Sequence, residues 1–563
     1  MCDQRPEPSA VPVGLRSRAC PVSHVSGRSA ERILPLLVTV LACLVLYRSP
    51  WSASDLAISP DSFHYASAAQ RFARLGDHSI LVNGRPLPPA YPPFFAKLVL
   101  APSYMLLGDE IGNGIYPVLF FGLVGVLAAY GIGLELSGPW GGLFAAIMVL
   151  VSPHFRYYSR EIMTDGPACS LGLVACWLFL RIQERLSPRI LTLAGLVVAS
   201  AASLRVLASF SVVPFAWLAW SRRREFPGSA KVNLALLAAP LMAVHLLERC
   251  YNQLTFGVWS RNGHHFWWPV PFDYPELVFS IRYVRINVWW LLDTPFLLAV
   301  LWGGAGVLIL RQVSRRSQGV RDPRPVLVYL LLAAGLPSLI HLFFFYLDLR
   351  LHMPLLTGLA VVGGAGLGAA IPESFRENRR WPAIAAAVVM SAAAIHRSMA
   401  PPSLPPGRIF ASVIAGVTPE DAVVITGACP PYLEALAGGR RSFVPIARWV
   451  KFANTFVAPE RVALPDPYPS TAKDARCAGL LAGGAYDVYP FAAGENLELI
   501  EQWIREGRSV WVDSSYVPAA DATLFALRSR FELSPVPDVG WLGALAIRKG
   551  GPPSGDGSGP NAH

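Results

Sequence analysis

Charged residues are scarce in this chain of 563 residues. Asp, Glu, Lys and Arg make up 15% of it, whereas apolar residues make up 53%. An average soluble domain carries about a quarter of charged residues, so an ordinary soluble protein of this length is excluded. The mean hydropathy is positive as well. Most of the chain is therefore expected to be solvated by lipid.

Paired cysteines and internal repeats are absent from the sequence. The eight cysteines show no zinc-type or redox-type spacing, so we expect no metal cluster. Cys429 and Cys477 fall in the polar C-terminal part, where an oxidising compartment allows either a disulfide or two free buried thiols. No small-residue cleavage pattern follows the apolar run at 33–47, which we interpret as an uncleaved first span.

The net charge of +11 does not indicate nucleic acid, because the arginines stand in short clusters between apolar runs. Such clusters set membrane orientation, since basic loops stay in the cytoplasm. About eleven spans are expected from the length that a helix needs to cross the hydrocarbon. They lie at 33–48, 112–135, 138–152, 166–181, 190–208, 209–221, 232–249, 287–310, 325–345, 353–371 and 382–399.

One orientation satisfies every short basic loop. With the basic N-terminus in the cytoplasm, the arginines near 181–189, 222–224, 311–324 and 376–380 all lie on the cytoplasmic side. The outer side then receives the first loop, the turn at 152–165, the loop at 250–286, the link at 346–352 and everything after 400. We expect a multi-pass protein of the cell (inner) membrane. The short apolar run at 94–107 is expected to lie on the outer surface.

The C-terminal part changes character after a proline-rich linker at 401–406. It mixes strand-like runs at 422–426 and 509–512 with helical patterns at 431–437 and 496–506, which together predict a small α/β domain. The predicted fold class is thus an α-helical polytopic membrane protein with a small C-terminal α/β domain. The predicted domains are a disordered cytoplasmic segment 1–32, a transmembrane domain 33–400 with a large first outer loop 49–111, an extracytoplasmic domain 401–549 and a disordered tail 550–563.

The first outer loop carries Asp61 four residues before Tyr65, at the start of a helical pattern over 62–74. A carboxylate held against a membrane cavity is a functional candidate. The alternative is that Asp61 simply caps the helix.

Two further elements place ionisable groups at outer span ends. The turn at 157–165 holds Arg160, Glu161 and Asp165, and the two acids would share one face if the turn were helical. The alternative is an Arg160–carboxylate pair with Asp165 as a helix cap. Arg350 lies between two late spans, where it either snorkels to the membrane surface or binds a phosphate through the two donors of its guanidinium. Arg205 interrupts the span at 190–208 near its outer end, where it is either buried at a cavity or snorkels to the membrane surface.

These three elements, in this order and at these span boundaries, resemble the GT-C superfamily of polyprenyl-phosphate-sugar-dependent glycosyltransferases. The branch of protein mannosyltransferases and lipid A aminoarabinose transferases is the most similar. The resemblance covers roughly 33–400. It implies a GT-C-like fold in which Asp61 is the first-loop catalytic carboxylate. Arg160, Glu161 and Asp165 correspond to the second acidic cluster, and Arg350 with Pro354 to the late Arg-x-x-x-Pro element near the lipid phosphate.

Two positions depart from the pattern of the family. Ser62 stands where members often have a second acid, and Tyr91-Pro92-Pro93 stands where many carry Lys-Pro-Pro. A lysine that usually contacts the phosphate is therefore missing.

The resemblance implies transfer of a sugar from a polyprenyl-phosphate donor to a hydroxyl of a lipid, glycan or protein acceptor, with inversion. Asp61 would be the general base, assisted by Glu161 and Asp165. Tyr65, Arg160, Arg205 and Arg350 would bind substrate, with Arg282 as a further candidate for the phosphate. No cofactor is expected, although a divalent cation between the carboxylates is chemically feasible.

Two functions from other classes compete with this one. A multi-pass membrane transporter should show related halves and mid-membrane ionisable residues, whereas the acids here stand at span ends. A non-catalytic membrane scaffold would not need Asp61, Glu161 or Asp165.

Overall fold

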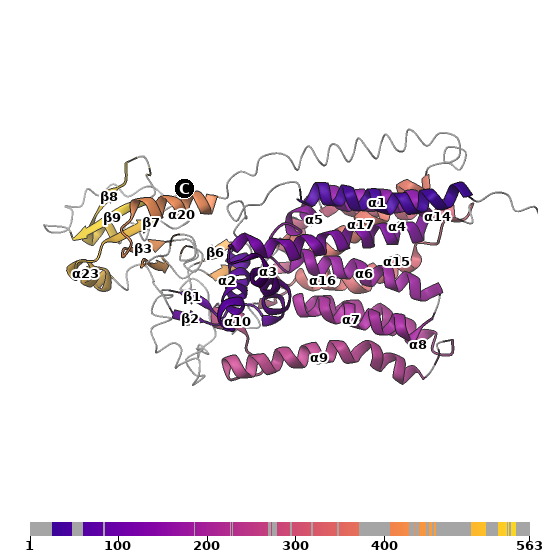
Figure 1. The fold of residues 1–563 in the computed structure, drawn as a ribbon, viewed down its shortest axis with the longest axis horizontal. Coiled ribbons are helices and arrows are strands. Elements are labelled where there is room, and N and C mark those ends of the chain that lie inside the picture. The colour runs from indigo at the N-terminus through magenta and orange to yellow at the C-terminus, as the bar shows by residue number, and fades with distance from the viewer. Residues whose placement is uncertain are drawn as a thin grey trace, which may run out of the picture.

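The computed structural model describes residues 25–47, 60–82, 85–184, 186–225, 227, 229–267, 272, 278–292, 296–316, 319–345, 348–370, 406–426, 433, 437, 440–445, 450–452, 455–457, 497–513, 527–537, 539 and 542–547. Long helices form a bundle at one end of the molecule, and a small mixed sheet lies at the other (Figure 1).

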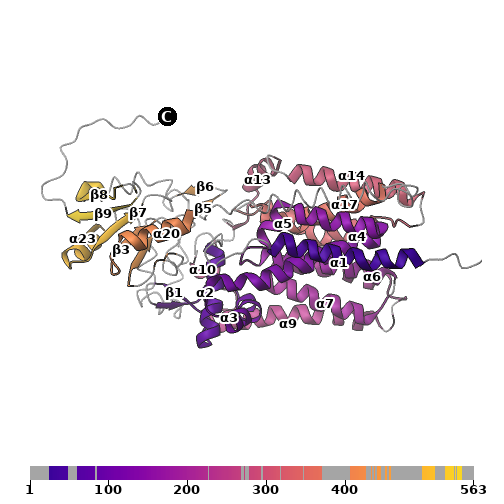
Figure 2. The same cartoon turned by 45° about the horizontal axis from the view of Figure 1, so that its top comes forward.

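The bundle consists of apolar helices that run side by side (Figures 1 and 2). Their bounds are α1 (Val25–Tyr47), α4 (Ile115–Val151), α6 (Asp165–Glu184), α7 (Pro188–Leu204), η3 (Val206–Ser211), α8 (Val212–Ser221), α9 (Ala230–Phe256), α14 (Phe296–Ser314), α15 (Arg324–Leu330), η4 (Leu331–Gly335), α16 (Leu336–His341) and α17 (Met353–Ala370). Six described segments are long and apolar enough to cross a membrane. They confirm the predicted polytopic helical class.

Helix α4 is a hairpin of two helices rather than one rod. Ser137 and Gly138 leave the helical conformation, with Gly138 at φ 78°, and Pro139 follows inside the second half. A Cβ built on Gly142 would lie 2.9 Å from the backbone oxygen of Tyr130, which a straight helix would place about 18 Å away. The two halves therefore fold back on each other, as predicted for separate spans at 112–135 and 138–152.

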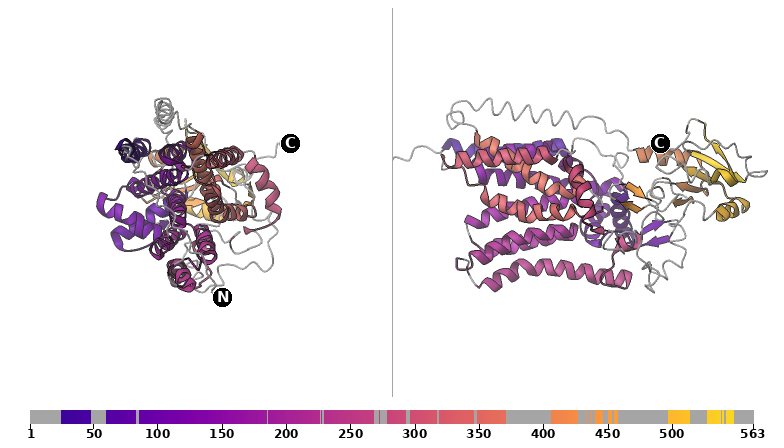
Figure 3. Two further views of the ribbon diagram at one scale, coloured as in Figure 1. Left: turned by 90° about the vertical axis from the view of Figure 1, so that its right-hand side faces the viewer. Right: turned by 180° about the vertical axis from the view of Figure 1, so that it is seen from behind.

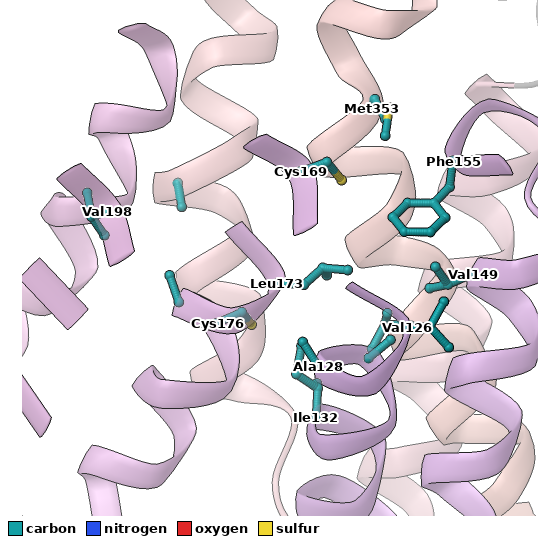
Figure 4. Close-up of a cluster of buried hydrophobic side chains, with 14 of the residues drawn as sticks. Val126, Ala128, Ile132, Val149, Phe155, Cys169, Leu173, Cys176, Val198 and Met353 are labelled. Carbon is teal, nitrogen blue, oxygen red and sulfur yellow. The ribbon is translucent and has the colours of Figure 1, made fainter. Parts of the chain in front are cut away.

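Small residues let the central helices approach closely. Gly364 of α17 faces the α4 backbone, where an added Cβ would lie 2.7 Å from the Cα of Ala145. Membrane helices associate through such close packing, because lipid offers no hydrophobic drive to bring them together. Figure 4 shows the buried side chains that fill the remaining space, among them Val126, Phe155 and Leu173.

The peripheral helices expose apolar surface. In the most apolar 18-residue stretch of each helix, only 17% is buried in α9 and in α14, against 72% in α6. The exposed large side chains include Met242, Leu246, Leu247 and Leu254 of α9 and Leu297, Leu298, Leu301 and Leu308 of α14. Contiguous apolar surface of this extent requires a lipid environment. Figure 3 shows both helices at the outside of the bundle.

The end of the bundle predicted to face the cytoplasm is joined by ion pairs. Glu135, at the turn of α4, pairs with Arg181 at 2.7 Å and with Arg321 at 2.9 Å. Arg321 also pairs with Glu184. Arg181 and Arg321 therefore meet at the same end of the bundle, although 140 residues separate them in the sequence, and this agrees with the assignment of both to one side of the membrane.

The opposite end of the bundle carries short elements that connect the long helices. They are α2 (Pro60–Leu75), β1 (Ile80–Val82), β2 (Arg85–Leu87), η1 (Phe95–Leu100), α3 (Ala101–Leu107), η2 (Ile111–Gly114), α5 (Pro153–Tyr158), α10 (Gly263–Trp267), α13 (Arg282–Leu292) and η5 (Leu349–His352). Elements α2, α3 and α10 lie between the bundle and the C-terminal sheet in Figures 1 and 2. The helical segment predicted at 94–107 is present as η1 and α3.

The C-terminal sheet has the strand order β4-β3-β7-β9-β8. Strands β4 (Ser442–Pro445), β3 (Val423–Thr426) and β7 (Val510–Asp513) are parallel, whereas β9 (Leu542–Ile547) and β8 (Phe531–Pro535) are antiparallel. Helices α20 (Pro406–Val417) and α23 (Leu497–Arg505) accompany it, and β5 (Val450–Phe452) pairs with β6 (Thr455–Val457). The predicted α/β fold of this part is confirmed.

Two apolar clusters cover the two faces of this sheet. Val423 and Ile425 join Ile500 of α23 in one cluster, while Val424 joins Ile414 of α20 in the other. This alternation follows from the period of two in a strand. The α20 cluster also contains Phe63 of α2, which is 3% exposed. The C-terminal sheet is thereby fixed at the end of the molecule that carries Asp61.

Two predicted spans need comment. The span predicted at 287–310 includes α13, which ends at Leu292, and α14, which begins at Phe296, while 293–295 lie outside the described residues. The predicted span at 382–399 lies outside the described residues, as do Cys429 and Cys477.

Substitution of Gly364 by Ala is expected to destabilise the bundle by about 1–3 kcal/mol, because the new methyl group overlaps the α4 backbone. Thermal unfolding of the detergent-purified protein measures this. Gly304→Ala on α14 is the matched control, since nothing lies within 4 Å of its added Cβ. Equal melting temperatures for the two variants would contradict the close α4–α17 packing.

Candidate active site

Asp61 lies in the first turn of α2. Pro60 begins this helix, with its fixed φ suited to a first helical position, and a carboxylate is favourable near the helix N-terminus. Asp61 is not limited to this local role, because its Oδ2 accepts a hydrogen bond of 2.7 Å from Nη1 of Arg350. The ion pair joins residues that are 289 positions apart.

Arg350 belongs to the 3-10 turn η5, immediately before α17. The Asp348 side chain caps this turn by accepting a hydrogen bond of 3.0 Å from the Arg350 backbone N–H. The Asp348 carboxylate also lies 3.5 Å from Nε of Arg350. Only 17% of the Arg350 side chain and 19% of the Asp61 side chain are exposed. The guanidinium is therefore held between two carboxylates at the end of the bundle.

The surroundings of Asp61 favour its charged form. Burial alone would raise the pKa of its carboxyl, but the charge of Arg350 and its hydrogen bond outweigh burial, with contributions from Tyr91 and Arg205. The pKa of Asp61 consequently lies below its ordinary value. A buried carboxylate that stays ionised near neutral pH is suited to accept a proton.

The turn before α6 packs against the same face of α2. The Ser62 hydroxyl donates a hydrogen bond of 3.1 Å to Oε1 of Glu161, and the hydroxyls of Tyr65 and Thr164 are 3.3 Å apart. All four residues are buried. The condition under which Glu161 and Asp165 would share a helix face is not met, because the segment at 160–164 is not helical and α6 begins only at Asp165.

Asp165 pairs with Arg205, which lies between α7 and η3. Arg205 has extended backbone angles, with φ −143° and ψ 112°, where the helix of α7 ends. Only 4% of the Asp165 side chain is exposed, against 35% of the Arg205 side chain. Arg205 thus reaches into the site from a helix break instead of snorkelling along the membrane surface.

Two carboxylates and two guanidinium groups therefore meet at this end. Asp61 interacts electrostatically with Arg205 as well as with Arg350, and Arg350 also interacts with the charge of Asp165. Arg160 is buried in the adjoining turn, and burial with the neighbouring charge of Arg156 lowers the pKa of Arg160 to about 10. The guanidinium groups of Arg205 and Arg350 could each donate two hydrogen bonds to a negatively charged group such as a phosphate.

Aromatic rings pack together near Asp61. Tyr91 stacks on Tyr65 with ring centroids 4.4 Å apart, and the ring of His264 meets Tyr91 edge-on at 5.1 Å. Burial lowers the pKa of His64 and of His264 to about 4, so both imidazoles are neutral at pH 7. His264 also stacks on Phe272, so that its ring forms part of an aromatic layer.

Six of the seven predicted site residues are thus connected in one place. Asp61, Tyr65, Glu161, Asp165, Arg205 and Arg350 are linked through hydrogen bonds, ion pairs or neighbouring charges, and Arg160 lies in the same turn as Glu161. Arg282 begins α13, but its side chain lies outside the described residues. Within the described residues, no group of three or more His, Cys, Asp or Glu side chains is arranged to hold a metal ion.

Sequence reasoning missed the role of Tyr91 and the link between Ser62 and Glu161. In the sequence, Ser62 and Tyr91 stand out only because they differ from the family pattern. The available signal was their place in the family pattern, because a position that is functional in the family lies in the site even when another residue type occupies it.

Part of the sequence matches a known family. Residues 91–247 match the model of the dolichyl-phosphate-mannose-protein mannosyltransferase family. No curated protein matches the sequence significantly.

Two solved structures of one protein share the fold over nearly the whole chain. ArnT from Cupriavidus metallidurans, bound to undecaprenyl phosphate, has a TM-score of 0.57 and 14% identity over 92% of this chain and 98% of that chain. Its apo state gives 0.57 and 13% over the same shares. The Archaeoglobus fulgidus oligosaccharyltransferase tethered with an acceptor peptide has a TM-score of 0.48 and 11% identity over 92% of this chain and 74% of that chain.

The match at 91–247 and the shared fold confirm the resemblance that the motifs indicated. The chain is a multi-pass membrane protein with the GT-C fold, similar to the branch of protein mannosyltransferases and aminoarabinose transferases.

Proposed function

We propose that this protein is a membrane glycosyltransferase that moves a sugar from a polyprenyl-phosphate donor to an acceptor hydroxyl on the extracytoplasmic side. The observation that carries the proposal is the ion pair between Asp61 and Arg350 at the end of the bundle. It combines a group able to take a proton with a group able to hold a phosphate. The similar ArnT binds undecaprenyl phosphate, which supports a donor of this class.

In the proposed reaction, Arg350 exchanges part of its contact with Asp61 for the donor phosphate. Asp61 then takes the proton of the acceptor hydroxyl as its oxygen attacks the anomeric carbon. The bond from that carbon to the phosphate oxygen breaks, and its electron pair leaves with the polyprenyl phosphate. Arg350 stabilises the departing negative charge. A single displacement of this kind inverts the anomeric configuration.

The remaining polar residues are proposed to hold this arrangement. Glu161 accepts the hydrogen bond of Ser62, directly beside Asp61, and so fixes the start of α2 against the turn before α6. Asp165 keeps Arg205 directed at the site. Tyr65 positions α2 through Thr164. No step of this mechanism needs a cofactor.

The C-terminal sheet is proposed to face the extracytoplasmic side, where the acceptor arrives. It packs on Phe63, two residues after Asp61, and so borders the site. The acceptor itself is a lipid, glycan or protein hydroxyl.

Asp61→Asn is expected to lower the rate of sugar transfer at least about 100-fold, because an amide of the same shape cannot take the proton. Initial rates in proteoliposomes that contain a polyprenyl-phosphate sugar measure this. Asp77→Asn is the matched control, since Asp77 lies in the same loop but forms an exposed pair with Arg71. A fully active Asp61→Asn variant would remove Asp61 from the mechanism.

Arg350→Ala is expected to weaken use of the donor far more than Arg350→Lys, because Ala removes the charge whereas Lys loses only the fork. The dependence of initial rate on donor concentration separates the two. We expect the donor KM to rise about tenfold for Arg350→Lys. For Arg350→Ala we expect the initial rate not to saturate with donor over the concentrations tested. If Arg350 served only to anchor the helix end, both variants would saturate at the wild-type donor concentration.

Arg205→Met is expected to lower the free energy of unfolding by about 3 kcal/mol, because it leaves the buried Asp165 carboxylate without this partner. Thermal unfolding in detergent measures the loss. The double variant Arg205→Met/Asp165→Asn should recover much of it, since the uncompensated charge is gone. Strictly additive losses would show that the two residues do not act as a pair.

A further inference from the structure

Two ionisable side chains interrupt the lipid-facing surface of α9. The His245 side chain is 31% exposed and that of Glu248 is 19% exposed. Their neighbours on the helix include the exposed apolar residues Met242, Leu246 and Leu247. An ionisable group on a membrane span is costly to keep there, so a group at such a place is a functional candidate.

Glu248 and Arg249 lie where α9 leaves the hydrocarbon. From Ala230, where α9 begins, the helix rises about 27 Å to Glu248, which is close to the thickness of the hydrocarbon core. The polar residues Asn252 and Gln253 follow in the next turn. The helix therefore changes from apolar to polar at the level of the lipid headgroups.

Contacts of the last turns of α9 place this level at the end of the molecule that carries the candidate active site. The Tyr251 hydroxyl and Nδ1 of His78, in the loop after α2, are 3.2 Å apart. Nη1 of Arg249 donates a hydrogen bond of 3.0 Å to the carbonyl of Trp259, whose side chain is 50% exposed. Tryptophan is enriched at membrane–water interfaces. Glu248 and Arg249 are thus next to the headgroup layer at that end.

The Glu248 side chain is oriented, but its carboxylate has capacity for further partners. Nε2 of His245 lies 3.0 Å from the hydroxyl oxygen of Ser209 in η3, and Nδ1 of His245 lies 3.9 Å from Oε2 of Glu248. The second distance is too long for a hydrogen bond. Among the described residues, none donates a hydrogen bond to the Glu248 carboxylate, which can accept several.

Arg249 has unused capacity as well. The described residues engage its guanidinium by a hydrogen bond at Nη1, which leaves the N–H groups of Nε and Nη2 available. Arg249 is exposed, so these donors can reach the headgroup layer. A carboxylate and a guanidinium therefore stand on adjacent residues, each able to bind a group of opposite charge.

This pair of charges is complementary to a zwitterionic phospholipid headgroup. Its phosphate can accept two parallel hydrogen bonds from a guanidinium, and its ammonium can donate to a carboxylate. The nitrogen must carry N–H bonds, because a quaternary ammonium has none to donate. We infer that Glu248 and Arg249 form a binding site for a phospholipid whose headgroup carries a primary amine. The site does not involve Asp61 or Arg350, and it binds lipid whether or not the protein transfers a sugar.

Phosphatidylethanolamine and phosphatidylcholine test the site, because their headgroups differ only in the methylation of the nitrogen. The full-length protein in detergent is given equal amounts of both, and native mass spectrometry counts the lipid molecules that stay bound. We expect the wild type to retain about tenfold more phosphatidylethanolamine than phosphatidylcholine, since only the former can bond to Glu248. Equal retention would overturn the inference.

Glu248→Gln removes the negative charge and keeps the shape of the side chain. We expect this variant to retain the two lipids about equally, whereas Arg249→Gln should retain less of both. Glu225→Gln is the matched control, because Glu225 also pairs with a nearby arginine, Arg222, but lies on the exposed turn at the opposite end of the bundle. The control should keep the preference of the wild type. An unchanged preference in Glu248→Gln, or its loss in the control as well, would overturn the inference.

Two further lipids test the wild type without any substitution. A dimethylated ethanolamine headgroup keeps one N–H, so we expect its lipid to be retained well above phosphatidylcholine. Retention equal to phosphatidylcholine would mean that the bulk of the headgroup decides, and it would overturn the inference. Phosphatidylglycerol has the phosphate but no amine and should be retained no better than phosphatidylcholine. Preferential retention of phosphatidylglycerol would show selection for negative charge alone and would likewise overturn it.

Discussion

The ion pair between Asp61 and Arg350 is the constraint on which the rest of the site depends. Its partners come from the first loop and from the turn before α17, and both are largely removed from water. An unpaired charge at such a place is costly, because low dielectric surroundings cannot solvate it. The elements that carry the two residues must therefore be packed so that the charges meet. The neighbouring pair of Asp165 and Arg205 obeys the same requirement.

Helix packing is what makes this meeting possible. Arg350 precedes α17, whose Gly364 lies against the α4 backbone, and the hairpin of α4 leads directly into the turn that holds Glu161. Close backbone contacts leave little room for the helices to slide. The far end is fixed separately by Glu135 with Arg181 and Arg321. The ion pairs at one end of the bundle thus hold helices together, whereas those at the other end belong to the candidate active site.

The C-terminal sheet is connected to this chemistry through Phe63, an aromatic side chain of α2. Phe63 lies in the apolar cluster of α20 and β3, while Asp61 and Ser62, which precede it, contact Arg350 and Glu161. One turn of helix therefore links the sheet, the turn before α6 and the turn before α17. A shift of the sheet would act on Asp61 through this turn, because a helical turn moves as a unit.

Local patterns in the sequence determined the membrane class, most helices of the bundle, the α2 helix, strands β3 and β7, and the identity of Asp61 and Arg350 as candidates. Hydropathy, helical periodicity and strand alternation are properties of neighbouring residues, so they can be recognised without a structure. Tertiary structure alone decided that Asp61 pairs with Arg350, that Asp165 pairs with Arg205, that Tyr91 stacks on Tyr65 and that Phe63 joins the C-terminal sheet. It also decided that Glu161 and Asp165 do not share a helix face. These relations depend on how helices pack across hundreds of residues of chain, and no local pattern carries that information.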